Sequence, residues 1–225
     1  MEEFPTFTSI KAPPSLKEMA FDSIKESILA HKLKPGAIYS EQVIAKELCI
    51  SKTPVHQALI DLEARGFVTV LPRKGFQVNV LNEKDIQDMF RFRHALERAV
   101  IFDVTPGLTD ESIKEIESLN AQAARTRDRI RFLKFDRGFH RYLTSLTQNQ
   151  YIIKALENIW DLCDWVGGEI FHLKNRPEEA VREHVAVAEM LKKGDTEGAA
   201  EAMKEHLRIT EMRFHQLMSQ QDTTP

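Results

Sequence analysis

The hydrophobic pattern of this chain changes character once, at residues 81–83. Before that point, helix-like spacings are followed by two short runs rich in β-branched and aromatic residues, which are typical of strands. After it, apolar residues recur only at helical spacing, up to about residue 219. We therefore predict a mainly α protein with a small N-terminal domain of three helices and a β-hairpin over residues 15–81, and an all-α helical bundle over residues 84–219.

The two ends of the chain carry weaker patterns. Residues 1–14 contain three prolines and no sustained periodicity, so we expect a flexible N-terminal arm. Residues 220–225 are expected to form a disordered tail.

The first predicted helix has a clear start. In the segment Ser15-Leu16-Lys17-Glu18, the serine oxygen can accept from the Glu18 backbone N–H while the glutamate reaches back to the serine N–H. This capping box is followed by apolar residues at helical spacing. The turn at Lys34-Pro35-Gly36 ends the segment.

Two further short helices follow. The second is expected over residues 41–48 with Ser40 as its cap, and its predicted buried side consists of Val43, Ile44 and Leu48. The third is expected to begin at a cap on Ser51 or Thr53 and to end before Gly66. Its predicted inward residues are Val55, Ala58, Leu59 and Leu62.

Residues 67–71 and 76–80 then read as two strands joined by Pro72-Arg73-Lys74-Gly75, a hairpin with a basic tip. Three short helices followed by such a hairpin is the element order of a winged helix-turn-helix. In that arrangement the third helix enters the DNA major groove, which is about 12 Å wide, and the wing holds phosphates. The candidate DNA-binding residues are Gln42, Lys52, Thr53, His56, Gln57, Arg73, Lys74 and Gly75, the glycine allowing close approach of the backbone.

Bulk composition narrows the class of protein further. The chain has 31 basic and 34 acidic residues, a net charge of −3, so contact with DNA must come from a local patch. The two cysteines, Cys49 and Cys163, lie among apolar neighbours and are expected to be reduced core thiols. No apolar run approaches the roughly 18–20 residues of a membrane span, and the N-terminus lacks the pattern of a secretory signal. We expect a cytoplasmic protein with no membrane partner.

A longer string of residues in the N-terminal part carries a family resemblance. It reads Leu33-Lys34-Pro35-Gly36, Ser40-Glu41, Ala45, Leu48, Ser51-Lys52-Thr53-Pro54-Val55-His56-Gln57-Ala58-Leu59, Leu62-Glu63, Gly66-Phe67-Val68 and Arg73-Lys74-Gly75-Phe76-Gln77-Val78. The string resembles the GntR family of transcriptional regulators, which implies sequence-specific binding to double-stranded DNA, as a homodimer on a palindromic operator. Lys52 and His56 stand where the family usually has arginine, so an operator borrowed from relatives does not transfer.

The C-terminal part is expected to contain six helices, at about 84–104, 109–127, 129–147, 151–172, 177–193 and 195–219. Several of their apolar stripes carry polar residues. Asp136 and His140 share one stripe, and His184 and His206 lie in two others. One carboxylate oxygen and three imidazole nitrogens suit a divalent transition metal such as zinc, nickel or manganese. The alternative is that each histidine hydrogen-bonds separately within the core.

A second resemblance bears on these residues. The run Asp136-Arg137-Gly138-Phe139-His140 with the following Leu143 and Asn149 matches an Asp-x-x-Phe-His-x-x-Leu pattern followed by Asn. It looks like the FCD effector domain of FadR-type regulators, in its six-helix, VanR-like form. The resemblance implies that Asp136, His140, His184 and His206 are metal ligands and that the domain binds a small effector, expected to be a carboxylate.

Arg93, followed by Leu96-Glu97, matches the Arg-x-x-Leu-Glu pattern of the same domain, in which the arginine faces the effector cavity. Arg93 and Asn149 are therefore the candidate effector-binding residues. An ion pair of Arg93 with Glu97 or Asp136 is the competing interpretation.

Three functions remain open at this point. The first is a ligand-controlled transcriptional regulator, normally a repressor. The second is a metal-dependent enzyme that carries a DNA-binding module, although no additional base or nucleophile motif accompanies the metal-ligand candidates. The third is a regulator with a metal-free apolar ligand pocket.

Overall fold

The computed structural model describes residues 13–167 and 176–221, and these separate into two compact units, Met1–Val80 and Leu81–Pro225. The predicted arm over residues 1–14 lies outside the described residues except for its last two positions. The predicted tail begins too early, because residues 220 and 221 still belong to the last helix. No described helix is long and apolar enough to span a membrane.

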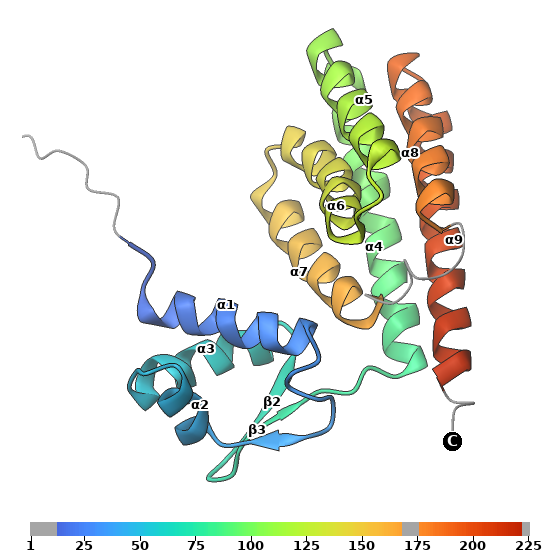
Figure 1. The fold of residues 1–225 in the computed structure, drawn as a ribbon. Helices are drawn as coiled ribbons and strands as arrows, with labels where there is room; N and C mark the ends of the chain where they lie inside the picture. Colours follow the sequence, from blue (N-terminus) through green and yellow to red (C-terminus); the bar gives the residue numbers. More distant parts are fainter. Residues whose placement is uncertain (1–12, 168–175, 222–225) are drawn as a thin grey trace, which may run out of the picture. The chain divides into compact units, whose positions relative to one another are not determined.

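Within residues 13–80, the N-terminal unit contains three helices and a small sheet (Figure 1). The helices are α1 (Leu16–Leu29), α2 (Glu41–Glu47) and α3 (Lys52–Ala64). The strands β1 (Ile38–Tyr39), β2 (Val68–Leu71) and β3 (Gly75–Val78) form an antiparallel sheet in the order β1-β3-β2. Val70 pairs with Phe76 across the hairpin, and Ile38 pairs with Gln77 on the other side. The mainly α fold and the winged helix-turn-helix are as predicted, whereas β1 was not foreseen.

Local chemistry explains where α1 begins and where α3 ends. The predicted capping box at Ser15 is present, with the Glu18 backbone N–H donating to the serine Oγ. Ser40 and Ser51 occupy the N-cap positions of α2 and α3, but neither side chain makes the capping hydrogen bond expected of it. Gly66 follows α3 with a φ of 83°, which suits glycine.

The buried side of α2 differs from the prediction. Val43 is exposed, and the buried residues of the helix are Glu41 and Ala45. Cys49, expected in the core, is exposed in the turn after α2 with a φ of 55°, while Cys163 is buried as expected. The apolar face of α3 is as predicted: Val55, Ala58, Leu59 and Leu62 are fully buried.

Over its described residues, the C-terminal unit is an all-helical bundle. The ends of its helices differ from the predicted ends by no more than two residues wherever the structure describes them. Its helices are α4 (Glu83–Val104), α5 (Asp110–Arg125), α6 (Arg129–Leu146), α7 (Gln150–Gly167), α8 (Arg176–Lys192) and α9 (Thr196–Gln221). A 3₁₀ turn, η1 (Thr105–Gly107), joins α4 to α5. The part of the predicted fourth helix beyond residue 167 lies outside the described residues.

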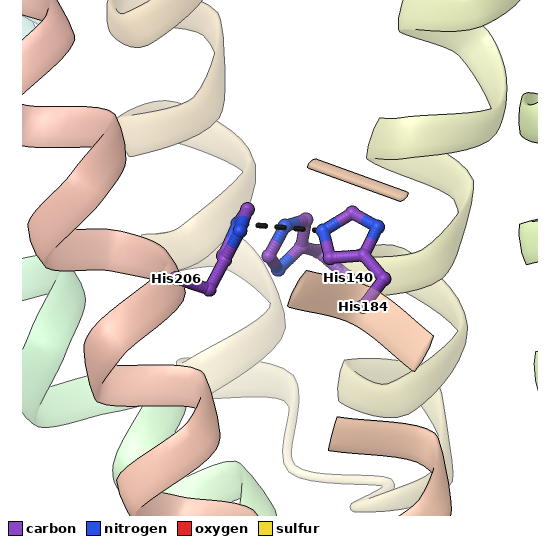
Figure 2. Close-up of side chains that lie close together, drawn as sticks. All are labelled: His140, His184 and His206. Carbon is purple, nitrogen blue, oxygen red and sulfur yellow. Dashed lines mark hydrogen bonds between the residues drawn. The ribbon is translucent and has the colours of Figure 1, made fainter. Parts of the chain in front are cut away.

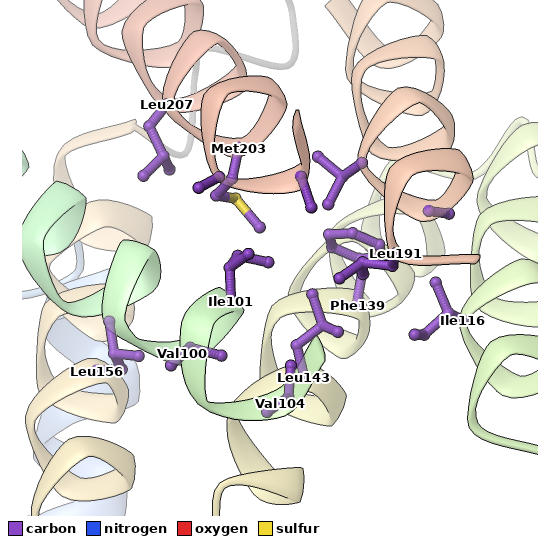
Figure 3. Close-up of a cluster of buried hydrophobic side chains, with 14 of the residues drawn as sticks. Val100, Ile101, Val104, Ile116, Phe139, Leu143, Leu156, Leu191, Met203 and Leu207 are labelled. Carbon is purple, nitrogen blue, oxygen red and sulfur yellow. The ribbon is translucent and has the colours of Figure 1, made fainter. Parts of the chain in front are cut away.

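The core of the bundle is a large apolar cluster contributed by several helices (Figure 3). Ile101 of α4, Phe139 of α6, Leu191 of α8 and Leu207 of α9 are among its buried members. Helix α4 packs against α6, α7 and α9, and α8 packs along α9. This packing brings residues far apart in sequence to one level of the bundle, where the predicted metal ligands lie.

Candidate functional site

The predicted recognition surface of the N-terminal unit is exposed. Lys52, Thr53, His56 and Gln57 are all exposed at the N-terminal half of α3, and Gln42 is exposed on α2. Hydrogen-bonding side chains are thus available where a recognition helix needs them.

A buried glutamate positions two of these side chains. Glu41 is 7% exposed; its Oε1 lies 3.0 Å from His56 Nδ1, and its Oε2 accepts from Lys52 Nζ at 3.1 Å. Burial disfavours the charged form of Glu41, but the hydrogen bonds from His56 and Lys52 outweigh it and lower the pKa of the carboxyl. Helical periodicity does not reveal this residue, because a glutamate is counted as surface.

At the wing, Arg73 and Lys74 are exposed at the tip of the β2–β3 hairpin. Gly75 has a φ of 115°, and a Cβ there would lie 2.1 Å from the Tyr39 carbonyl oxygen. The pairing of β1 with β3 therefore requires this glycine, which is an internal reason separate from the predicted approach to DNA.

Three histidines from three helices meet inside the bundle: His140 of α6, His184 of α8 and His206 of α9 (Figure 2). Each is 2% exposed or less. The Nε2 atoms of His184 and His206 are 3.3 Å apart, and one nitrogen of each of the three rings lies within 4.8 Å of the others. The sequence places these rings in separate stripes, and the structure brings them together.

Carboxylates bind two of the rings through Nδ1. Glu97 Oε2 accepts from His140 Nδ1 at 2.6 Å, and Glu183 Oε2 accepts from His206 Nδ1 at 2.8 Å. With Nδ1 donating, Nε2 of each ring keeps its lone pair for another partner. A carboxylate behind a ligating histidine is the usual outer shell of a protein metal site. No sequence pattern indicates Glu183, which precedes His184 directly but does not belong to the row of apolar residues on its helix.

Asp136 lies beside the three histidines. Its Oδ1 is 3.8 Å from His184 Nε2 and, among the described residues, has no hydrogen-bond partner. Burial raises the pKa of Asp136, although the positive charges around it act in the opposite direction. Burial lowers the pKa of His184 and of His206 well below the usual range, and nearby positive charges lower both further. Neutral imidazoles and an unpartnered carboxylate oxygen are the donors that a divalent transition metal takes.

Arg93 lies beside this cluster and is 5% exposed. Its Nε donates to Glu97 Oε1 at 2.7 Å, so the ion pair with Glu97, the competing interpretation of Arg93, is present. A terminal nitrogen of the same guanidinium is 3.3 Å from His140 Nε2. Burial opposes ionisation of Glu97, but His140 and Arg93 outweigh it and hold the pKa of Glu97 well below its usual range.

Asn149 has a different environment. It is exposed, and its Oδ1 accepts from the backbone N–H groups of Tyr151 and Ile152, at the start of α7. This is the geometry of a helix cap. Its predicted contact with an effector stays a prediction.

Comparison with known proteins decides the family. The model of the gntR family of bacterial regulatory proteins matches residues 16–78, and that of the FCD domain matches residues 88–209, more than half of the chain. The chain belongs to the GntR family and carries an FCD domain.

Two relatives and one structure illustrate the likeness. The regulator YdfH of Escherichia coli O6:H1 is 25% identical over 203 residues, which cover 89% of each chain. The transcriptional repressor RspR of Escherichia coli K12 gives the same identity and coverage. The structure of Escherichia coli McbR/YncC superposes with a TM-score of 0.76 at 21% identity, covering 92% of this chain and 100% of the other, and shows the same fold.

This GntR-family protein is accordingly a DNA-binding transcriptional regulator, and its FCD domain is of a kind that binds small-molecule effectors. A metal-dependent enzyme is not supported, because the family and the relatives are regulators.

Proposed function

We propose that this regulator is a repressor whose operator binding responds to a carboxylate effector held at a metal in the helical bundle. The metal ligands in this proposal are Asp136, His140, His184 and His206. The observation that carries it is the convergence of histidine nitrogens backed by Glu97 and Glu183, with an unpartnered carboxylate oxygen beside them.

The surrounding residues support a built metal site over three separate core histidines. Separate histidines need only one partner each, whereas here two rings are fixed through Nδ1 and also have neighbours at Nε2. His140 Nε2 lies 3.3 Å from Arg93, and His206 Nε2 lies 3.3 Å from His184 Nε2. When bound, zinc, nickel or manganese would supply positive charge and open positions for an oxygen ligand. Glu97 and Glu183 orient the rings and increase their basicity.

Arg93 is suited to hold the effector. Its Nε is committed to Glu97, which fixes the plane of the guanidinium, while the nitrogen near His140 Nε2 points toward the cluster. Once His140 Nε2 serves the metal, that N–H needs another acceptor, and a carboxylate oxygen provides one. Arg93 and the metal ligands would then bind the same anion.

On the DNA side, we propose that Lys52, Thr53, His56 and Gln57 contact bases and nearby phosphates in the major groove, while Gln42, Arg73, Lys74 and the Gly75 backbone contact phosphates. One winged helix offers few contacts, so we propose a homodimer on a palindromic operator. Sedimentation should give about twice the chain mass of 25.9 kDa. A monomer that protects a single half-site would contradict the dimer.

The test uses His184→Ala with His94→Ala as its matched control, since His94 is half-buried on α4 and pairs with Glu211. We expect His184→Ala to lose bound metal and the effect of carboxylates on operator binding, yet to keep operator affinity. His94→Ala should behave as the wild type. Circular dichroism establishes that both variants are folded.

Two results would contradict the proposal. One is a folded His184→Ala protein with full metal content. The other is a His184→Ala protein whose operator affinity still responds normally to the carboxylate that acts on the wild type.

A further inference from the structure

Helix α5 carries one buried polar side chain that the metal site as described does not use. Asn120 is 4% exposed, and within the described residues neither its Oδ1 nor its Nδ2 has a hydrogen-bond partner. A buried amide left unpaired costs about 1–3 kcal/mol, whereas a leucine of similar size at the same place would cost nothing of the kind. Packing therefore does not explain the asparagine.

The neighbours of Asn120 along α5 fix its level in the bundle. One turn earlier, Ile116 belongs to the same buried cluster as Phe139 of α6 and Val187 of α8. One turn later, Ala123 packs with Phe132 of α6 and Ala180 of α8.

Asn120 thus lies between these two clusters. On α6 and α8, the residues between the same two clusters include Asp136 and His184. The adjacent Leu119 agrees with this register, because its Cδ2 would lie 3.3 Å from a Cβ added at Gly138. The buried Asn120 amide and the unpartnered Asp136 Oδ1 therefore share one level of the interior.

The two unpartnered atoms of Asn120 differ in kind. Nδ2 donates and Oδ1 accepts, so together they fit a group that both accepts and donates, which a carboxylate alone does not. A hydroxyl does both. A 2-hydroxy acid carries such a hydroxyl next to the carboxylate that Arg93 and the metal would bind.

We propose that Asn120 is a specificity-determining residue of the effector site, which binds the hydroxyl of a small 2-hydroxy carboxylate beside Asp136. This inference rests on the proposed function, since it assumes that a carboxylate binds at the histidine cluster. It adds the chemical class of the effector and a residue that recognises it.

The test compares two probes that differ by one hydroxyl, acetate and glycolate, by calorimetry on the Zn²⁺-loaded protein. Wild type should bind glycolate about tenfold more tightly than acetate, the effect of one well-placed hydroxyl. Asn120→Leu should bind acetate as wild type does and lose the preference for glycolate. Asn120→Ala should also lose the preference for glycolate. This second variant tests the same role if leucine does not fit at position 120.

Asn158→Leu is the matched control, since Asn158 Oδ1 is also buried without a partner among the described residues, but on α7. It should keep the preference for glycolate. Retained preference in both Asn120 variants, its loss in Asn158→Leu as well, or equal binding of the two probes by wild type would overturn the inference while leaving the proposed function intact. If Zn²⁺-loaded wild type binds neither probe, the proposed function fails, and this inference fails with it.

Discussion

Replacing Glu41 with glutamine should loosen the N-terminal half of α3 and leave the helical bundle unchanged. Glu41 is buried and joins α2 to α3 through Lys52 and His56. Glutamine keeps the size of the side chain and one accepting oxygen. It removes the charge and turns an N–H₂ group toward one of the two donors.

The expected cost follows from the two contacts. The Lys52 side chain is 61% exposed, so its pairing with Glu41 is screened and contributes about 0–1 kcal/mol. The bond from His56 contributes about 0.5–1.5 kcal/mol, and glutamine can still accept one of the two bonds. We therefore expect Glu41→Gln to lose about 1 kcal/mol of local unfolding free energy, which is roughly fivefold in the opening equilibrium.

Hydrogen exchange followed by mass spectrometry measures this locally. Peptides that cover α2 and α3 should exchange about fivefold faster in Glu41→Gln, while peptides from α4 to α9 should not change. The chain's two tryptophans, Trp160 and Trp165, both lie in the C-terminal unit, so denaturation followed by their fluorescence should also be unchanged. Unchanged exchange in α3 would refute the positioning role of Glu41.

The difference in local stability between wild type and Glu41→Gln should also decrease as the pH falls. The folded pKa of Glu41 is lowered, so its contribution is complete above the unfolded value of about 4.3 and is lost as the pH falls through the folded value. Wild type and Glu41→Gln should therefore converge in acid.

Three further changes test the N-terminal unit. Lys52→Ala should weaken operator binding by about 1–3 kcal/mol if Lys52 contacts a base, or reduce the salt dependence of binding if it contacts phosphate. Anisotropy titrations at several salt concentrations distinguish the two outcomes, and Lys46→Ala, at an exposed position of α2, is the control. Gly75→Ala should destabilise the sheet by about 2–3 kcal/mol in thermal melts, whereas Gly107→Ala, where a Cβ meets nothing within 4 Å, should not. Ser15→Ala should cost about 1 kcal/mol in chemical denaturation, because the capping box is lost.

Most of the helices could be predicted from the sequence because their signals are local. The Ser15 box and the α3 stripe from Val55 to Leu62 depend on neighbours within a few residues, and the structure has both. Strand β1 has only two residues and exists through its pairing with β3, so no periodicity reveals it. The prediction of the buried side of α2 was wrong for a related reason, since Glu41 is buried against its partners Lys52 and His56 on α3.

The candidate metal site shows the same division. Asp136, His140, His184 and His206 stand out because they are polar residues on apolar stripes. The convergence of the three histidines depends on how α6, α8 and α9 pack, and the pattern of one helix does not contain that information. Glu183 and Asn120 were missed because nothing in the sequence distinguishes them from other polar residues. Glu183 stands out only through its bond with His206, and Asn120 only through its buried atoms that lack a partner among the described residues.

Anomalous diffraction from crystals of the Zn²⁺-loaded regulator tests the central claim most directly. We expect a single strong peak about 2.0–2.2 Å from a nitrogen of each of His140, His184 and His206 and from one oxygen of Asp136, with Glu97 and Glu183 still bonded to the outer ring nitrogens. A map with no peak among these four residues, or with zinc bound elsewhere while the histidines keep their metal-free hydrogen bonds, would contradict the account.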